Sequence, residues 1–315
     1  MARPLRKPDL DPMEPAYEAA STRRGPIAKA APDVVTSISS AQLFFGADRD
    51  ATVHARGEDF RLLRGDCLKT LASLPAASVD MIFADPPYFL SNGGSTCSGG
   101  KRVNVHKGGW DASRGVSQDH AFNLAWLSAC QRVLKPSGTI WVSGTQHVIF
   151  SIGFAMQTLG FHLLNTVTWF KPNAAPNLAC RFFTHSTEII LWAAPNRGKK
   201  LLHTYNYRDM KAENGGKQMR DLWAMPEPGG EQVVWSLPTP PKSEKSHGRH
   251  PTQKPLQLLE RVVRAGSSPG QVILDPFNGS GTTGVAAIAS GRKYVGIDVD
   301  ENYLDLTARR ITGAR

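Results

Sequence analysis

The segment FADPPYFLSNGG, residues 83–94, places one acid, two prolines and an aromatic ring directly after a buried apolar run. Proline cannot continue the hydrogen-bond ladder of a central strand, so the backbone must leave the sheet at this point. Asp85 and Tyr88 are then held stiffly at the rim of the sheet. A rigid, acidic turn of this kind indicates a functional site.

A second chemical motif lies near the end of the chain. Gly279, Gly281 and Gly284 spell G-x-G-x-x-G, and Asp298 follows nineteen residues after the first of them, at the end of the apolar run YVGID. Glycines let a loop approach a ligand closely, and an acid at the end of the next strand can accept hydrogen bonds from both ribose hydroxyls. The glycine pattern alone also occurs in plain strand-to-helix turns, but the acid at this offset favours a nucleotide-binding half.

Strands and helices alternate along the part of the chain that carries these motifs. Apolar residues at helical spacing indicate amphipathic helices, and short apolar runs between turn residues indicate buried strands. The alternation predicts an α/β fold with a mostly parallel sheet covered by helices. The expected elements are a strand ending near Gly65, a helix over 67–74, a strand over 79–84, a helix containing Phe122, Leu124, Trp126, Leu127 and Val133, a Pro-Ser-Gly turn, a strand over 139–143, a helix and two strands between 151 and 195, a helix over 255–264, a strand over 272–274, and a final helix and strand.

The position of the glycine motif predicts the order of the sheet. Only thirty-one residues follow Gly284, too few to build a doubly wound sheet onward from this half. The remaining strands must therefore be those upstream, around MIFADPPY, which makes the doubly wound sheet circularly permuted. A nicotinamide-dependent oxidoreductase usually begins with its glycine loop and has no use for the Asp-Pro-Pro-Tyr turn, so that alternative is disfavoured.

Composition indicates a globular protein with a sizeable core. The chain has 315 residues, 41% of them hydrophobic, and contains no apolar run long enough to span a bilayer. Its N-terminus carries charges and prolines where a signal peptide needs an apolar stretch, so we expect a soluble, cytoplasmic protein with no membrane partner. Cys67, Cys97, Cys130 and Cys180 are scattered without a C-x-x-C motif, which predicts neither a metal site nor a disulfide framework.

Charge and composition divide the chain into four parts. Residues 1–50 hold seven basic and seven acidic residues without periodicity and are expected to form a disordered extension. Residues 51–195 and 250–315 are the two halves of one domain, separated by a loop-rich insertion over 196–249. From Lys171 to Lys254, thirteen lysines and arginines stand against seven acids, with aromatics interleaved. Such a surface either binds a polyanion with exposed bases or is an ordinary solvated face.

Several motifs in one order resemble a known family, the beta-class DNA amino-methyltransferases, and in particular the DpnA-type adenine methyltransferases. The resemblance spans about residues 61–310 and is carried by FADPPYFLSNGG, APNLACRFFTHSTE, HPTQKP and DPFNGSGTTG. It implies that the region over 196–249 recognises the target, and that the catalytic half is 51–195 and the cofactor half 250–315. The N-terminal extension and the segment KGGWD, where relatives often carry an acid just before Trp110, depart from the family pattern.

The activity implied by the resemblance is methyl transfer from S-adenosylmethionine to adenine N6 in a short DNA sequence, with GATC the expected site, in double or single strands. It further implies a restriction-modification setting, with DNA, a second copy of the chain and a cognate restriction endonuclease as partners. Asp85 and the carbonyl of Pro86 would accept hydrogen bonds from the two N–H groups of the target amine, with Pro87 stiffening the turn. Tyr88 would stack on a base that is flipped out of the duplex.

The resemblance also assigns cofactor contacts. Asp66 and the adjoining Cys67 would lie near the adenine amino group, and Asp298 at the ribose. The segment that closes over the methionine end carries His250, Thr252 and Lys254, with Lys254 paired to the cofactor carboxylate. The residues expected in the loop beneath the methionine are Asp275, Phe277, Gly279, Ser280, Gly281 and Thr282. For Asp66, a plain helix cap remains an alternative, and for Lys254 a plain surface lysine.

Competing reactions differ in the residues that they require. Cytosine-C5 methylation needs a nucleophilic cysteine that follows proline in that family, and the chain contains no Pro-Cys dipeptide. Cytosine-N4 methylation would use the same pair of hydrogen-bond acceptors and therefore stays an alternative, although its enzymes more often carry serine where this chain has Asp85. A binding module without catalysis would need the basic region but not both chemical motifs.

Overall fold

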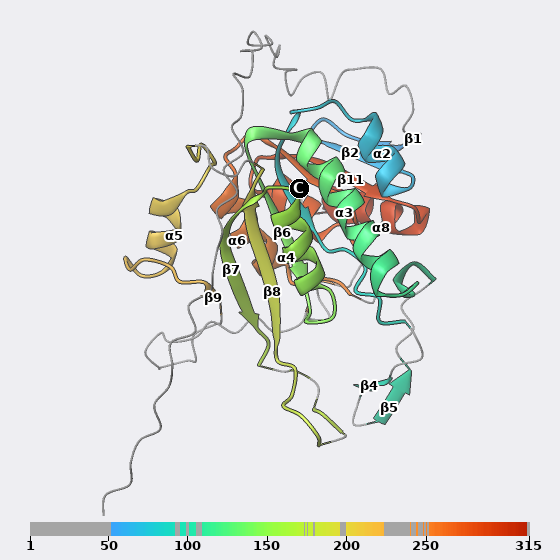
Figure 1. Cartoon of the computed structure of the whole chain (residues 1–315). Coiled ribbons are helices and arrows are strands. Elements are labelled where there is room, and N and C mark those ends of the chain that lie inside the picture. The colour runs from blue at the N-terminus through green and yellow to red at the C-terminus, as the bar shows by residue number, and fades with distance from the viewer. Residues whose placement is uncertain are drawn as a thin grey trace, which may run out of the picture. The chain divides into compact units, whose positions relative to one another are not determined.

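The computed structural model describes residues 52–91, 95–98, 101–104, 109–172, 174, 176–178, 180–195, 200–223, 240, 244, 248, 250 and 252–313. The extension over 1–50 and most of the stretch over 224–249 therefore lie outside the described residues. The dominant feature is a nine-stranded sheet in the order β1-β2-β11-β10-β3-β6-β8-β7-β9 (Figure 1). Its strands are β1 (Thr52–Arg56), β2 (Phe60–Arg64), β3 (Val79–Ala84), β6 (Leu134–Gly144), β7 (His162–Phe170), β8 (Thr187–Ala194), β9 (Leu222–Trp223), β10 (Val272–Asp275) and β11 (Lys293–Asp298).

The centre of the sheet confirms the predicted circular permutation. β10 and β11, the last two strands of the chain, lie between β2 and β3, and all neighbouring pairs from β2 to β6 are parallel. Every residue of β3 is buried, as expected for a central parallel strand covered on both faces. The chain thus places the acid-proline turn and the glycine loop on adjacent strands, although almost two hundred residues separate them.

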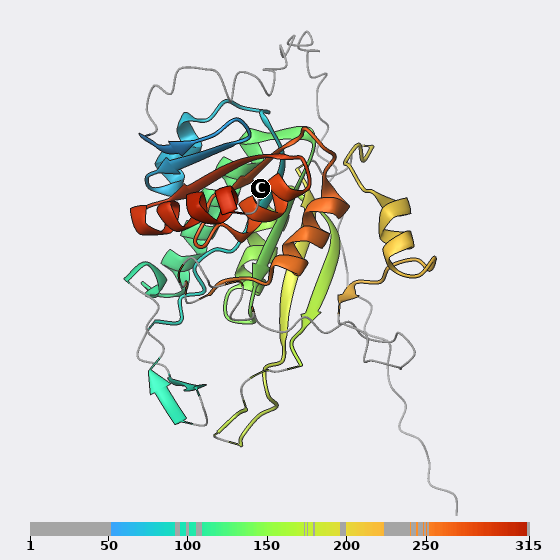
Figure 2. The same ribbon diagram turned by 180° about the vertical axis from the view of Figure 1, so that it is seen from behind.

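Helices cover both faces of the sheet, and each layer has its own apolar core (Figures 1 and 2). On one face pack α2 (Cys67–Ser73), α3 (Val116–Val133) and α4 (Ile149–Thr158), with Trp126, Leu127 and Ile152 buried against the strands. On the other face pack α6 (Leu256–Gly266), α7 (Thr282–Ala289) and α8 (Glu301–Gly313). None of the helices described is long and apolar enough to cross a membrane.

The sheet is not parallel throughout, because β8 runs antiparallel to both β6 and β7. Five of the eight strand pairs in this sheet are parallel, which agrees with the expected mostly parallel sheet. The described residues between β7 and β8 contain no helix, and a direct return without a helical crossover produces an antiparallel pair. A short separate hairpin, β4 (Ser95–Ser98) with β5 (Lys101–Asn104), follows the acid-proline turn in sequence.

Two expectations differ in detail. The Pro-Ser-Gly turn lies within β6 rather than before it: Leu134 pairs with Val79 and Thr139 with Met81, so the residues between them form a bulge that accommodates the proline. The predicted loop-rich insertion begins with ordered elements, α5 (Tyr207–Glu213) and β9, which extends the sheet beside β7. Met210 and Trp223 are buried and anchor this part on the core. The many polar residues around them made this apolar packing hard to predict from the sequence.

Candidate active site

Acidic and hydroxyl side chains follow the carboxyl ends of five parallel strands at one edge of the sheet. Asp66 follows β2, Asp85 follows β3, and Ser143 lies at the end of β6, while Asp275 and Asp298 end β10 and β11. Parallel strands present their carboxyl ends at the same edge, which is where open α/β sheets bind ligands. The fold therefore gathers most of the sequence-predicted site residues at one place.

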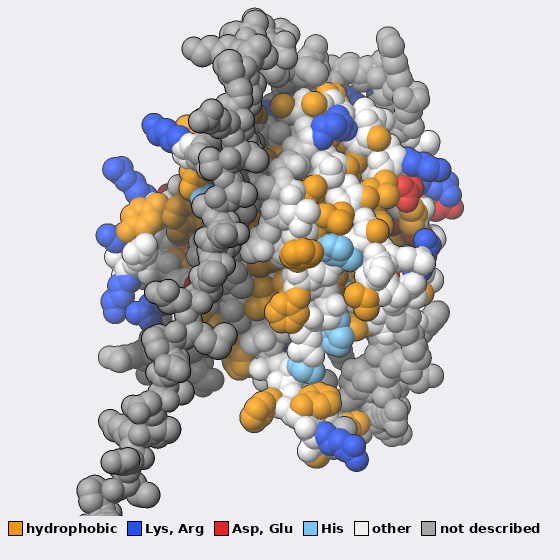
Figure 3. Space-filling view, viewed as in Figure 1, with side chains coloured by type: hydrophobic (Ala, Val, Ile, Leu, Met, Phe, Trp, Pro, Cys, Tyr) orange, Lys and Arg blue, Asp and Glu red, His pale blue; other side chains and the backbone are white. Residues whose placement is uncertain are grey.

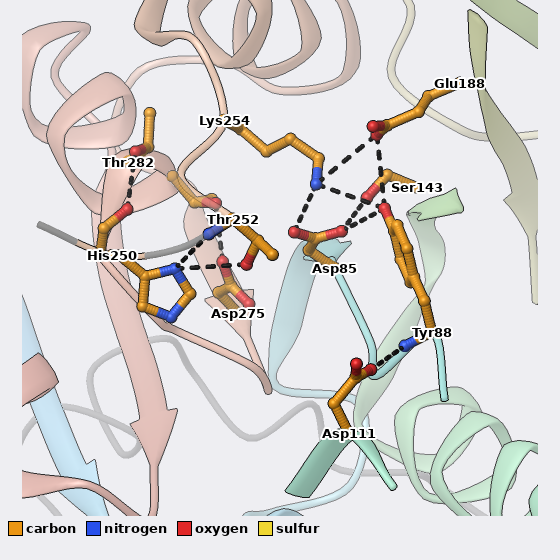
Figure 4. Close-up of polar contacts among 12 residues, drawn as sticks. Asp85, Tyr88, Asp111, Ser143, Glu188, His250, Thr252, Lys254, Asp275 and Thr282 are labelled. Carbon is orange, nitrogen blue, oxygen red and sulfur yellow. Dashed lines mark hydrogen bonds and ion pairs between the residues drawn. The ribbon is translucent and has the colours of Figure 1, made fainter. Parts of the chain in front are cut away.

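Asp85 is the centre of a buried polar network (Figure 4). Its Oδ1 atom accepts hydrogen bonds from the hydroxyls of Tyr88, at 2.7 Å, and Ser143, at 2.6 Å. Its Oδ2 atom accepts a bond from Nζ of Lys254 at 2.5 Å. The same ammonium lies 3.6 Å from Oε2 of Glu188 and 3.3 Å from the hydroxyl of Tyr88. Glu188, at the start of β8, is held in turn by Lys171 at 2.9 Å.

The network keeps Asp85 and Lys254 in their charged forms. Burial alone would raise the pKa of Asp85, but the Lys254 ammonium and the hydroxyls of Ser143 and Tyr88 lower it below its usual value. Burial would likewise lower the pKa of Lys254, yet the carboxylates of Asp85 and Glu188 raise it. Burial beside those two acids raises the pKa of Tyr88 well above its usual value, so the phenol stays neutral and donates.

Asp111 holds the backbone that follows the acid-proline turn. Its carboxylate accepts bonds from the backbone N–H groups of Tyr88 and Phe89, both at 2.9 Å, from Leu90 at 3.2 Å and from the Ser91 hydroxyl at 2.9 Å. Phe89 has a φ of 58°, a left-handed conformation that a bulky residue adopts only when its surroundings impose it. Asp111, which is buried, supplies that constraint.

A cavity of about 260 Å³ opens beside Asp85 at this edge. Four carboxylates lie in its wall, those of Asp66, Asp85, Asp298 and Asp300, together with apolar side chains such as Phe122 and Phe277. A wall of this composition can hold a flat heterocycle between apolar groups while acids accept bonds from its amino group and ribose hydroxyls. The complete lining is Gly65, Asp66, Cys67, Asp85, Pro87, Phe122, His250, Thr252, Pro276, Phe277, Ile297, Asp298, Val299, Asp300 and Tyr303.

Asp66 and Asp298 line the cavity and also accept hydrogen bonds from backbone N–H groups. Oδ1 of Asp66 caps α2 by accepting from the N–H groups of Leu68 and Lys69, each at 3.1 Å, so the capping alternative holds alongside the cavity position. Asp298 accepts from the N–H of Gly279 at 2.8 Å and of Asp300 at 3.0 Å. Burial raises the pKa of Asp298 to about 6, although these backbone bonds oppose the shift.

A smaller cavity of about 30 Å³ adjoins the first and shares Asp85, His250, Thr252 and Phe277 with it. Its wall adds Lys254, Asp275, Ser280 and Thr282, all predicted for the methionine end of the cofactor. Burial raises the pKa of Asp275 to about 7, even though the Thr283 hydroxyl and the Phe277 N–H donate to it.

The glycine loop takes part mainly through its backbone. Gly279 and Gly281 have φ values of 49° and 70°, a region in which side chains are strained. A Cβ atom on Gly281 would also collide with the side chain of Thr307 in α8. Neither glycine lines the cavities, so here they permit the turn and its packing against α8.

The structure brings together most of the predicted residues but gives some of them unexpected surroundings. Pro86 is buried and Tyr88 is 7% exposed, with its hydroxyl turned to Asp85 and its ring outside the walls of both cavities. Stacking of Tyr88 on a flipped base therefore stays a prediction. Lys254 is 7% exposed and bound to Asp85, not a surface lysine; its pairing with a cofactor carboxylate also stays a prediction.

Sequence reasoning gave no role to Glu188, Asp111 or Tyr303. Glu188 ends the quoted motif THSTE, and its place directly before the apolar run IILWAA could have marked it as an acid at the start of a strand. Asp111 carried a signal only as the acid of KGGWD. Tyr303 follows the acid-rich end of β11 and lies in the cavity wall, with its ring centroid 4.4 Å from that of His250.

A second cavity, of about 550 Å³, opens on the Glu188 side of the network. Glu188 and Lys171 lie in its wall with the polar residues Gln146, His147 and His185. The charged network thus separates this larger cavity from the one that Asp85 lines.

Comparison with known proteins identifies relatives of the whole catalytic region. A family model described as DNA methylase matches residues 79–309. The type II methyltransferase M2.DpnII of Streptococcus pneumoniae is 50% identical over 250 residues, which cover 79% of this chain and 88% of the relative. The cytosine-N4-specific PvuII DNA methyltransferase is 18% identical, with a TM-score of 0.60, covering 82% of this chain and 88% of that one. The protein in the crystal structure of the M1.HpyAVI-SAM complex is 23% identical, with a TM-score of 0.54, and the match covers 80% of this chain and 98% of that one.

Proposed function

Because this chain belongs to the DNA methylase family, and is an S-adenosylmethionine-dependent DNA methyltransferase, we propose that it methylates the N6 amino group of adenine. The observation that carries the proposal is the position of Asp85, the first residue of the acid-proline turn, in the wall of a cavity suited to a nucleotide cofactor. Mass spectrometry of nucleosides from DNA incubated with the enzyme and labelled cofactor tests it. N6-methyladenine is the expected product.

The chain's own groups act on the target amine by accepting hydrogen bonds from its N–H groups. The amino nitrogen of adenine is a poor nucleophile because its lone pair is delocalised into the ring. When Asp85 and the Pro86 carbonyl accept hydrogen bonds from its two N–H groups, the nitrogen becomes more electron-rich and its lone pair is aimed in one direction. Tyr88, Ser143 and Asp111 hold the two acceptors still, so little reorganisation is needed at the moment of reaction.

The cavity of about 260 Å³ fits the cofactor by its donor and acceptor set. Asp66 and Asp298 would accept bonds from the adenine amino group and the ribose hydroxyls, while Phe122 and Phe277 enclose the ring. The smaller cavity with Asp275, Ser280 and Thr282 would hold the methionine end. When bound, S-adenosylmethionine supplies an electrophilic methyl group on its sulfonium.

Cytosine N4 is the second candidate target, since the same two acceptors can serve any exocyclic amino group. The fold does not separate the two, because the cytosine-N4-specific PvuII enzyme shares it. Asp85, where cytosine-N4 enzymes more often carry serine, favours adenine. N4-methylcytosine as the sole product would overturn the assignment.

The target sequence and cellular setting are part of the same proposal. We expect GATC as the site, in a restriction-modification system with a cognate endonuclease, in the cytoplasm where its DNA substrate lies. The 50% sequence identity to M2.DpnII, a type II methyltransferase, supports this setting. Methylation of oligonucleotides that differ only at one position of GATC tests the site. Methylated adenine in another sequence would overturn the assignment of the site but not that of the base. We also expect a homodimer, which sedimentation analysis at micromolar concentration would detect.

The exposed basic side chains on and after α5 support a role of this region in DNA binding. Lysine and arginine side chains gather over α5 on one flank of the molecule (Figure 3). Arg208, Lys211, Lys217 and Arg220 are all exposed there. Cations on a surface bind phosphates with little regard to sequence, so this flank would position the duplex while other residues read the bases.

A further inference from the structure

Four charged side chains form a compact set with balanced charge, with Asp85 in the wall of one large cavity and Glu188 and Lys171 in the wall of the other; Figure 4 shows Asp85, Glu188 and Lys254 of this set. Asp85 and Glu188 are the acids, and Lys254 and Lys171 are the bases. Lys254 Nζ lies 2.5 Å from Oδ2 of Asp85 and 3.6 Å from Oε2 of Glu188, while Lys171 binds the other oxygen of Glu188 at 2.9 Å. The Lys254 ammonium is thus closely bound to one acid while a second lies within reach.

The close contact with Lys254 weakens Asp85 as an acceptor. Oδ1 of Asp85 already receives two hydroxyl bonds, and Oδ2 faces the ammonium. When an amino group approaches the Asp85 carboxylate, the negative charge of that carboxylate is already largely neutralised by the Lys254 ammonium. Electrostatic help in a site shielded from water depends on charge that is not already compensated, so Asp85 would act more strongly once the ammonium has moved away.

The ammonium can leave Asp85 only if another anion receives it. Lys254 is buried, and separating a buried charge from its partner is costly when no replacement is at hand. Glu188 meets this need: Oε2 points toward the ammonium, and Lys171 holds Oε1 in place. The Tyr88 hydroxyl lies 3.4 Å from the same Oε2 atom and 3.3 Å from Nζ, so it bridges the two positions.

We propose that Glu188 is a positioning residue that receives the Lys254 ammonium when Asp85 binds the amino group of the target base. The inference rests on the proposed function, because it presumes that Asp85 accepts from that amino group. No covalent bond changes in this step; one ion pair replaces another within this partly buried set. The cofactor carboxylate is the competing destination for Lys254, and the experiment separates the two.

The test compares Glu188→Gln with a matched control, Asp80→Asn. Asp80 is also a buried acid paired with a lysine, Lys135 at 2.7 Å, but it lies at the opposite end of β3. We expect Glu188→Gln to lower the single-turnover methylation rate about tenfold or more, with dissociation constants for cofactor and duplex within about threefold of the original. Glu188→Asp should recover part of the rate. Asp80→Asn should reduce thermal stability but leave the rate nearly unchanged.

A structural readout accompanies the kinetics. In crystals of the enzyme with sinefungin and a GATC duplex, Lys254 should lie closer to Glu188 than to Asp85. Lys254 bound to the carboxylate of sinefungin, or still on Asp85, would overturn the inference, as would a normal rate in Glu188→Gln. The wild-type enzyme is the reference in each assay, so a cytosine product or no product would instead contradict the proposed function.

Discussion

Nζ of Lys254 lies 2.5 Å from Oδ2 of Asp85, although 169 residues separate the two in the chain. The contact joins the HPTQKP segment, predicted to close over the cofactor, to the turn that carries Asp85, the proposed acceptor for the target base. Cofactor segment and acceptor turn therefore share one buried ion pair. A substitution in the HPTQKP segment should therefore affect the acid-proline turn, and a substitution in the turn should affect the segment.

Removing the lysine should destabilise the fold in a pH-dependent way. Lys254→Met leaves Asp85 buried without its ammonium, and we expect a loss of about 3 to 5 kcal/mol in the free energy of unfolding at pH 7.5. Lys254 lowers the pKa of Asp85, so its stabilisation is present above the ordinary pKa of aspartate and is lost as the pH falls through the lowered value. Without the ammonium, burial raises the pKa of Asp85 in the variant, so urea unfolding from pH 7.5 to 4 should show the difference shrinking as that carboxyl takes up a proton. A constant difference would contradict the pairing.

Asp85→Asn should stop methyl transfer while sparing the cofactor. Replacing the carboxylate by an amide removes the charged acceptor, and we expect turnover to fall by about two to three orders of magnitude. Because Asp85 forms only one part of the cavity wall, the dissociation constant for S-adenosylmethionine should change by less than about threefold. Calorimetry beside single-turnover kinetics measures both. Equal losses in binding and turnover would mean that Asp85 holds the cofactor rather than the target amino group.

Asp111→Asn should disturb the acid-proline turn without touching the cofactor wall. The amide keeps one acceptor but turns donor groups toward N–H groups that Asp111 now binds, such as that of Leu90. We expect turnover, measured in single-turnover assays, to fall roughly 10- to 100-fold because the acceptors lose their alignment.

Asp119→Asn is the matched control for this change. Asp119 accepts similar loop bonds, from the Ser113 hydroxyl and the Arg114 N–H, but does not contact the turn. Its turnover should remain near that of the wild type. Equal turnover in both variants would mean that Asp111 does not position the acceptors.

Cofactor affinity should depend on pH through Asp298. Burial raises the pKa of Asp298 to about 6, and its ionised form is the better acceptor for ribose hydroxyls. Binding should therefore weaken as the pH falls below about 6. Asp298→Asn should cost about 1 to 3 kcal/mol of binding at pH 8 and flatten that part of the pH profile. A break near pH 7 that persists in the variant would belong to Asp275, whose pKa burial raises to about 7.

Neutralising the basic flank should reduce the salt dependence of DNA binding. For Lys211→Gln, Lys217→Gln and Arg220→Gln combined, the slope of log affinity against log salt should flatten by about 0.9 for each DNA phosphate that the variant no longer neutralises. The control combines changes at three exposed cations on the other flank, Arg56→Gln, Lys69→Gln and Arg309→Gln. Fluorescence anisotropy across salt concentrations measures both slopes. Identical slopes would leave the α5 cations as a solvated face.

Local patterns in the sequence were sufficient to predict the central elements. The apolar run over 79–84, bounded by turn residues and prolines, became a strand with the predicted bounds, because a continuous apolar stretch is stable only where both faces of a sheet are covered. The order of the two motifs along the chain, with the acid-proline turn before the glycine loop, predicted the permuted strand order that the sheet shows. Asp85 and Asp298 could be selected because each follows a strand at the edge where ligands bind.

Tertiary structure decided which side chains face one another. The pairing of Lys254 with Asp85, the place of Glu188 beside both, and the four bonds that Asp111 accepts all join residues from different elements. The antiparallel β8 and the anchoring of α5 depend in the same way on which surfaces bury apolar area together. Residue types and spacing specify a strand, a helix or a turn, because these depend on neighbours in the chain. Contacts across the sheet edge depend on how the layers pack, and packing distances have no counterpart in sequence spacing.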